Sequence, residues 1–131
     1  MADLKTPSEL KYAKSDEWVK IEGDIAIVGI SDFAQDQLND IVYVEYTVSP
    51  NDEIAVGDAF ASVESVKAAS DIYSHVAGVV LEVNKVAKDS PETLNSDPFG
   101  AGWLIKVKLS GDADLTGLMD AEAYKEYCAG S

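Results

Sequence analysis

The chain has 131 residues, of which 47% are hydrophobic, and this is enough to form the core of a single domain spanning residues 1–131. Ten lysines oppose 24 acidic residues, so the net charge is −14. Such a surface repels nucleic acids and anionic membranes. It favours partners that present basic docking patches, although solubility alone is an alternative explanation of the acidity.

The features that bear on location favour the cytoplasm. No apolar run approaches the length of a membrane span. Residues 1–5 show neither a secretory signal nor an Arg-rich transit peptide. Cys128 is the only cysteine, so no intramolecular disulfide can form. We therefore expect a cytoplasmic protein in which Cys128 is an ordinary residue near a helix end.

Short segments with alternating apolar residues dominate the chain and predict β-strands. In chain order they cover residues 18–22, 25–30, 42–46, 60–66, 72–76, 79–83 and 105–109. Turn signals separate them at residues 22–24, 49–52, 56–58 and 77–78. In two of the strands the expected apolar faces are Val42, Val44 and Tyr46, and Val79, Leu81 and Val83. The whole predicts a mainly β fold, a flattened antiparallel β-barrel or sandwich.

Few helices are predicted. Ser31 can cap a short helix over residues 31–39. Pro91 suits the first helical position of a single turn over residues 89–94. Between residues 112 and 128 apolar side chains recur at helical spacing, so we expect one or two C-terminal helices packed on the barrel.

The segment 59–78 contains the residues that indicate a chemical role. Two predicted strands flank the short connection Val66-Lys67-Ala68-Ala69, and two strands around a short connection form a hairpin. This places Lys67 at or beside the tip, where its ammonium is exposed and its small neighbours leave room for a modifying enzyme. A solvated surface lysine is the alternative interpretation.

The sequence on both sides of Lys67 resembles the lipoyl attachment motif. The matching core and turn positions are Asn51, Ile54, Phe60, Val63, Ala68, Ala69, Ile72, Gly78 and Val80. Biotin carriers have methionines beside their lysine, where this chain has Val66 and Ala68. The run Glu64-Ser65-Val66-Lys67-Ala68 instead resembles that of the glycine cleavage H proteins. Further resemblance to that family lies in Tyr12 with residues 17–19, in residues 29–35 and 102–106, and in Tyr124.

The resemblance implies a lipoyl-domain fold of the barrel-sandwich hybrid type, with lipoate joined covalently to Lys67 by a lipoate ligase or an octanoyltransferase. It also implies a carrier and not an enzyme. The carrier, a monomer, would shuttle the aminomethyl group of glycine from glycine decarboxylase (P protein) to aminomethyltransferase (T protein), in glycine catabolism and one-carbon metabolism. Dihydrolipoamide dehydrogenase (L protein) would reoxidise the arm. The cofactor and these enzymes supply the chemistry, and the carrier supplies position and recognition.

The resemblance also implies roles for individual residues. Glu64 and Ala68 belong to the attachment motif that lipoylating or partner enzymes would recognise, and Gly78 would form a turn of the motif. Glu17, which matches the family's Glu-Trp pair, is the candidate carboxylate of a cleft that holds the protonated amine of the cargo. A solvated acid on an edge strand is the alternative for Glu17. No metal site is expected.

Three positions depart from the family pattern. Asp16 stands where the family usually has histidine before Glu-Trp, and Phe33 and Gln37 fill helix positions that often carry histidine. His75 is the only histidine, and we expect it to be a surface or packing residue. These departures leave attachment at Lys67 intact but bear on any pocket that holds the loaded arm.

Other functions remain open at this point. A lipoyl relay, which hands lipoyl groups to other proteins, needs the same lysine hairpin. An unmodified interaction module would keep the barrel alone. An enzyme is the third class, and the sequence shows neither a nucleophile–base pair nor a phosphate-binding glycine loop for it. Reconstitution with the decarboxylase distinguishes a lipoyl relay from a carrier of glycine cleavage. The intact mass of the protein distinguishes an unmodified interaction module from a lipoylated carrier.

Overall fold

The computed structural model describes residues 6–111, 115 and 117–129. Its strands are β1 (Lys11–Tyr12), β2 (Glu17–Glu22), β3 (Ile25–Ile30), β4 (Ile41–Tyr46), β5 (Glu53–Ile54), β6 (Ala59–Ser65), β7 (Ala69–Tyr73), β8 (Gly78–Val83) and β9 (Ile105–Leu109). Its helices are α1 (Asp32–Leu38), α2 (Lys85–Asp89), α3 (Thr93–Ser96) and α4 (Ala121–Ala129).

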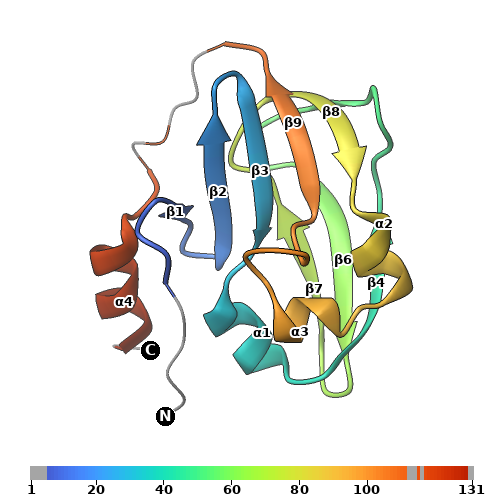
Figure 1. The fold of residues 1–131 in the computed structure, drawn as a ribbon, viewed down its shortest axis with the longest axis vertical. Coiled ribbons are helices and arrows are strands. Elements are labelled where there is room, and N and C mark those ends of the chain that lie inside the picture. Colours follow the sequence, from blue (N-terminus) through green and yellow to red (C-terminus); the bar gives the residue numbers. More distant parts are fainter. Residues whose placement is uncertain (1–5, 112–114, 116, 130–131) are drawn as a thin grey trace.

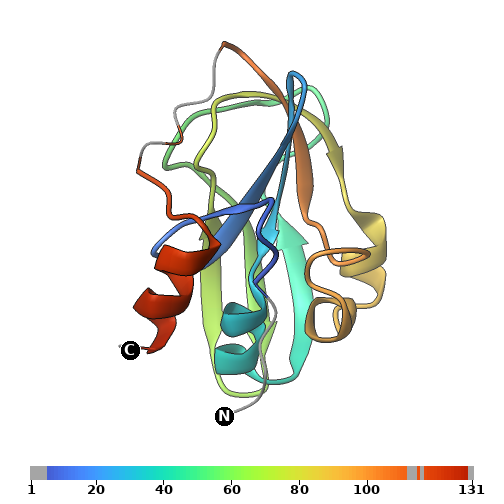
Figure 2. The same ribbon diagram turned by 60° about the vertical axis from the view of Figure 1, so that its left-hand side comes forward.

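The strands form two antiparallel sheets, with β4, β6 and β7 behind the larger sheet in Figure 1 and beside it in Figure 2. The strand orders are β1-β2-β3-β9-β8-β5 and β4-β6-β7. Buried side chains of both sheets, such as Val28 and Val107 from one and Val63 from the other, belong to a single apolar cluster. The core therefore lies between the sheets, and the predicted mainly β, two-sheet architecture is confirmed.

Two strands depart from the predicted alternation of buried and exposed residues. Strand β4 shifts register against β6 at Val42, so Val42 is 54% exposed while Val44 stays buried. Strand β8 shifts against β9 at Leu81, so Leu81 is 43% exposed and Val80 is buried. The predicted apolar faces are wrong at these positions because a β-bulge resets the two-residue alternation.

The short helices are mostly where the sequence predicts them. Helix α1 begins after Ser31, whose hydroxyl accepts a backbone N–H of the first turn, a cap that contributes about 1 kcal/mol. Helix α2 was not predicted, and Asn84 caps it by accepting the Val86 N–H at 3.0 Å. The helical turn expected at residues 89–94 lies later, because residues 91 and 92 form a turn and α3 begins at Thr93.

The tail differs from the prediction of helix over residues 112–128. Helix α4 begins only at Ala121, and the residues just before it are not helical. Met119 instead pairs with Tyr12, with N···O distances of 2.7 and 2.8 Å. This pairing gives backbone groups of β1 a partner and requires extended chain at Met119, which delays the helix. Residues 112–114 and 116 lie outside the described part.

A second apolar cluster connects α4 with the larger sheet, because it contains Ala121 and Tyr124 of α4, Tyr12 of β1 and Trp18 of β2. Figure 1 shows α4 beside β1. Gly29 is paired directly opposite Trp18. A Cβ at Gly29 would lie 2.7 Å from the indole, so only glycine leaves room for the ring. The rings of Tyr12 and Tyr124 stack with centroids 4.6 Å apart. This cluster fixes the start of β2, which carries part of the candidate site.

Gly78 lies in a strand and not in the turn expected from the motif. It opens β8, where it pairs with Ile54 and Leu109. A Cβ at this position would overlap the backbone carbonyl of Lys108, which cannot move without breaking the sheet. We expect Gly78→Ala to lower the free energy of unfolding by about 3 kcal/mol, measured by urea denaturation.

Gly111→Ala is the matched control. A Cβ at Gly111 meets no atom within 4 Å, and its φ is not left-handed. The control should change stability by less than about 0.5 kcal/mol. Equal stability of the two variants would contradict the role assigned to Gly78.

Candidate functional site

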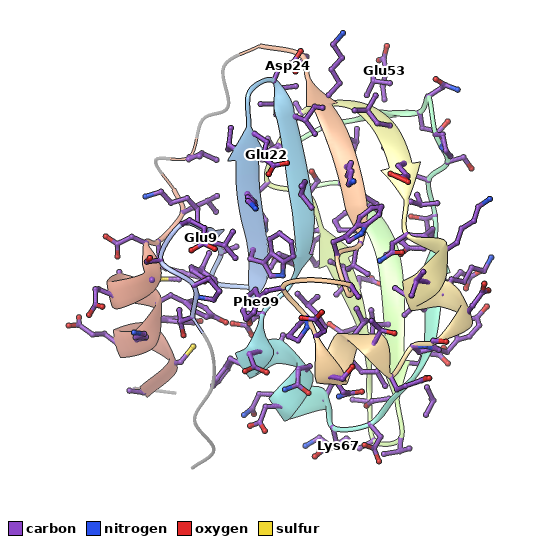
Figure 3. All side chains as sticks on the ribbon, viewed as in Figure 1. Glu9, Glu22, Asp24, Glu53, Lys67 and Phe99 are labelled. Atoms are coloured by element: carbon purple, nitrogen blue, oxygen red, sulfur yellow. The ribbon has the colours of Figure 1, made fainter. Side chains whose placement is uncertain are left out.

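Lys67 lies at the turn of the β6–β7 hairpin, at the end of the molecule opposite Asp24 (Figure 3). The predicted hairpin is confirmed, but its second strand begins at Ala69, three residues earlier than expected. The reason is that β7 stays paired with β6 up to the Glu64–Ala69 pair. Only residues 66–68 are left to connect the strands, and the Lys67 side chain is exposed.

Hydrogen bonds hold the backbone of this turn. The Ser65 hydroxyl accepts the N–H groups of Lys67 and Ala68 at 3.3 and 3.1 Å, and the Ser65 N–H donates to the Ala68 carbonyl at 2.7 Å. The Val66 N–H donates to the Asp40 carbonyl at 3.1 Å, which ties the turn to the loop before β4. The turn is therefore fixed to the body of the protein, while the lysine side chain is left to move.

The charges beside Lys67 are acidic. Glu64 and Asp71 are exposed on the same face of the hairpin, because their pairs, Glu64–Ala69 and Ser62–Asp71, are two positions apart in the β6–β7 pairing. Among the described residues, Lys67 forms no ion pair within 4.0 Å. An incoming enzyme therefore meets one mobile cation on an otherwise negative hairpin.

Glu17 lies against the other end of β7 and is buried, with 1% of its surface exposed. Its Oε2 accepts the Tyr73 N–H at 3.1 Å, and its Oε1 contacts the Ser15 hydroxyl and lies 2.9 Å from His75 Nε2. Strand β7 is an edge strand, so this carboxylate partners an N–H on the sheet edge. Strand β7 runs from Ala69, next to the lysine turn, to Tyr73. At about 3.3 Å per residue, these two residues lie about 13 Å apart. The interpretation of Glu17 as a solvated acid is wrong.

His75 is the residue of this site that sequence reasoning missed. Its side chain is 23% exposed and bonds to Glu17, which lies 58 residues away in the chain. Its Nε2 also lies 3.4 Å from the Ser15 hydroxyl. No local signal could have shown this contact, because folding alone brings the loop after β7 onto the start of β2.

Asp16 forms a second buried network with the tail helix. The Tyr124 hydroxyl donates to Asp16 Oδ1 at 2.9 Å and lies 2.6 Å from the Ser31 hydroxyl. Burial raises the pKa of the Asp16 carboxyl; the Tyr124 hydrogen bond lowers it and the neighbouring Glu17 charge raises it. Burial also raises the pKa of the Cys128 thiol, which favours the unreactive protonated form.

The remaining positions flagged in the sequence lie around these networks. Phe33 is partly buried against the second apolar cluster, and Gln37 is exposed on α1. Within residues 6–111, 115 and 117–129, no three His, Cys, Asp or Glu side chains are placed to hold a metal ion. In that same part of the chain, no helix has the length and apolar character needed to cross a membrane. The site thus consists of an exposed lysine and a buried carboxylate at opposite ends of β7.

Comparison with known proteins identifies the family. The family model described as Glycine cleavage H-protein matches residues 10–131. The chain belongs to the glycine cleavage H-protein family. The resemblance carried by residues 64–68 is thereby confirmed at the level of the family.

Individual H proteins match nearly the full length. A glycine cleavage system H protein of Carboxydothermus hydrogenoformans is 50% identical over 120 residues, which cover 92% of each chain. One of Alkaliphilus oremlandii is 54% identical over 125 residues, which cover 95% of this chain and 97% of the relative. The crystal structure of a glycine cleavage system H protein from Mycobacterium marinum matches with a TM-score of 0.81 and 32% identity, over 95% of this chain and 97% of that one.

The H-protein fold brings only some of the predicted site residues together. Glu64, Lys67 and Ala68 share the hairpin tip, as the sequence predicts. Glu17 lies against the opposite end of β7, and Gly78 lies in β8 within the larger sheet. Gly78 therefore shapes the sheet and does not contact the lysine turn through the pairing described.

The half-buried Asp16 carboxyl makes stability depend on pH in an unusual direction for an acid. Its pKa is raised on folding, so its contribution is most favourable at low pH and is lost as the pH rises through the folded-state pKa. Asn keeps an oxygen that accepts the Tyr124 hydroxyl and tolerates the φ of 75° at this position. We expect Asp16→Asn to raise the melting temperature at pH 7, with the gain vanishing as the pH falls.

Thermal unfolding followed by circular dichroism between pH 4 and 8 measures this effect. The exposed Asp71 provides the control, because Asp71→Asn removes an equal charge from a solvated position. If Asp16→Asn melted below the wild type at pH 7, the charge itself would be shown to stabilise the network.

Proposed function

We propose that this chain carries the aminomethyl group of glycine on a lipoyl group joined to Lys67. The observation that carries the proposal is an exposed lysine on a fixed hairpin turn, in a chain that belongs to the H-protein family. In this role the protein is a carrier of the glycine cleavage system in the cytoplasm, and catalysis belongs to its partners.

The residues around Lys67 fit a lipoyl group. An amide bond between Lys67 Nζ and the carboxyl of lipoic acid requires an amine that can enter another active site. The exposed side chain allows this, since it forms no ion pair with the described residues. When bound, the group would supply a disulfide that opens as it accepts the aminomethyl unit, and the dithiol left after transfer would be reoxidised by the dehydrogenase. The protein supplies the fixed turn, since Ser65 holds the backbone on both sides of the lysine.

Glu64 and Ala68 serve as the recognition elements of the turn. Glu64 presents its carboxylate three residues before the lysine on the exposed face, where a basic group of a lipoate ligase or octanoyltransferase can bind it. The Ala68 side chain is only a methyl group, so the hairpin tip beside Lys67 stays narrow enough to enter the active-site channel of a partner enzyme.

The acidic surface suits a carrier that meets several enzymes in turn. Glycine decarboxylase, aminomethyltransferase and dihydrolipoamide dehydrogenase each have to bind the same arm. A net charge of −14 attracts basic docking surfaces and speeds their encounter, with rates that fall as salt rises. No stable assembly is required, and we propose that the carrier works as a monomer.

Glu17 receives the amine of the cargo. The aminomethyl group contains an amine that is protonated near neutral pH, and a carboxylate shielded from water binds such a cation more strongly than a solvated one does. Support comes from the burial of Glu17 and from its contact with β7, the strand that leads from the lysine turn. Holding the amine there slows its loss to water.

Removal of the Lys67 amine should abolish modification. Co-expression with a lipoate ligase and lipoate should add one lipoyl mass to the wild type and none to Lys67→Arg, as measured by intact-protein mass spectrometry. Arginine preserves the charge but cannot form the amide under these conditions. A lipoyl mass on Lys67→Arg would overturn the assignment.

Two further variants serve as controls in the same assay. Lys85→Arg, at the start of α2, should be modified like the wild type. Glu64→Gln should be modified more slowly, by up to about fivefold, which is the size expected for one exposed charge pair. Exchange of labelled bicarbonate into glycine with the decarboxylase then separates glycine cleavage from a lipoyl relay.

Loss of the Glu17 charge should shorten the lifetime of the cargo. We expect Glu17→Gln to release ammonia and formaldehyde from the loaded carrier at least about tenfold faster than the wild type, because a charge-assisted hydrogen bond contributes about 1.5–3 kcal/mol. Release is followed with a formaldehyde-trapping reagent, and thermal melting checks that the variant is folded. An unchanged release rate would remove Glu17 from the proposal.

A further inference from the structure

The three partners of Glu17 differ in how easily they can give way. The Tyr73 N–H belongs to the backbone of β7 and cannot leave Oε2 without moving the strand. The other two partners are side chains at Oε1, the Ser15 hydroxyl and His75 Nε2. Of the bonded pair, the imidazole is 23% exposed and the carboxylate 1%. Ser15 is exposed as well, so access to Oε1 from solvent passes between the side chains of Ser15 and His75.

We propose that His75 is a positioning residue that competes with the amine of the cargo for Oε1 of Glu17, so that protonation of His75 weakens retention of the cargo. This inference rests on the proposed function of Glu17. His75 is the only cation that forms an ion pair with Glu17 among the described residues. When charged, the imidazolium supplies the positive charge that the carboxylate needs.

The competition follows from the charges of the two states. A protonated His75 and a protonated cargo amine are like charges, and both cannot approach one buried oxygen without strong repulsion. A neutral His75 leaves the carboxylate charge unbalanced, so the cargo amine becomes its cation. An imidazole gains its proton as the pH falls. Retention should therefore be stronger at high pH than at low pH.

The other groups around His75 do not replace it in this role. The Ser15 hydroxyl, 3.4 Å from Nε2, carries no charge. Asp16 is the next titratable group, since it interacts electrostatically with Glu17, and it is a second acid. Asp16 faces the tail helix through Tyr124 and makes no hydrogen bond or ion pair with His75 among the described contacts. Substitution of Asp16 therefore tests its contribution separately from that of His75.

The first experiment measures release of ammonia and formaldehyde from the loaded carrier between pH 5.5 and 8. It compares the wild type with His75→Gln, which keeps a side-chain hydrogen-bond donor but cannot become a cation. The ratio of the two rates cancels the intrinsic pH dependence of the cargo. We expect a ratio near one at pH 8 and a wild-type rate at least about fivefold higher at pH 5.5. A ratio that does not change with pH would overturn the proposal.

Two controls distinguish failure of the role proposed for His75 from an effect of Asp16 and from failure of the role proposed for Glu17. Asp16→Asn should keep the pH-dependent rise of the wild type, and a flat profile for this variant would assign the effect to Asp16 and overturn the role of His75. If Glu17→Gln released the cargo at the wild-type rate at every pH, the proposed function of Glu17 would fail, and not the role of His75 alone. If Glu17→Gln released the cargo faster than the wild type, but the ratio of the wild-type and His75→Gln rates did not change with pH, only the role of His75 would be rejected.

A second measurement needs no variant and no turnover. His75 is the only histidine, so its Hε1 proton gives one unambiguous NMR signal. We expect this signal to shift when the lipoylated carrier is loaded with cargo at pH 8, because the amine then takes the place of the ring at Oε1. An Hε1 signal that is identical in the loaded and unloaded carrier would overturn the proposal, whether or not His75→Gln folds.

Discussion

The buried carboxylate of Glu17 joins the two sheets at the place where the site is built. Glu17 begins β2 of the larger sheet and accepts the Tyr73 N–H from the edge of the smaller one. A carboxylate without water is stable only when its oxygens are hydrogen-bonded. Here Ser15, His75 and Tyr73 provide those bonds, so the position of the charge is set by the fold. The same contact anchors one end of the strand whose other end leads to Lys67.

The site combines an ordered backbone, the β6–β7 hairpin, with a mobile side chain, that of Lys67. The β6–β7 hairpin is held by strand pairing, and Ser65 holds the turn. Freedom of movement is therefore confined to the Lys67 side chain and to whatever is attached to it. A modifying enzyme meets the same backbone geometry each time, and the ordering cost of binding is small because the turn is ordered in advance. For a carrier that binds several enzymes in turn, this small ordering cost applies to each binding event.

The second apolar cluster supports local features that are unfavourable on their own. Asp16 has a left-handed φ of 75° and a carboxyl whose pKa is raised first by burial. The stacked rings of Tyr12 and Tyr124 and the buried indole of Trp18 hold this segment in place despite that cost. Strained or buried polar residues that persist in this way commonly lie beside functional sites. Here the functional residue is Glu17, the next residue in the chain after Asp16. Asp16 bonds to Tyr124, so one peptide bond separates the residue held by the tail helix from the site.

The sequence by itself determined the mainly β fold, the cap of α1 at Ser31, the family and the lysine hairpin, because these depend on two-residue alternation and on short local runs. It did not determine the bulges at Val42 and Leu81, since register depends on the partner strand. The late start of α4 was decided by pairing between distant segments of the chain. The contact between Glu17 and His75, 58 residues apart, was decided only when the sheets closed over their core, because burial and hydrogen bonding are properties of the assembled structure.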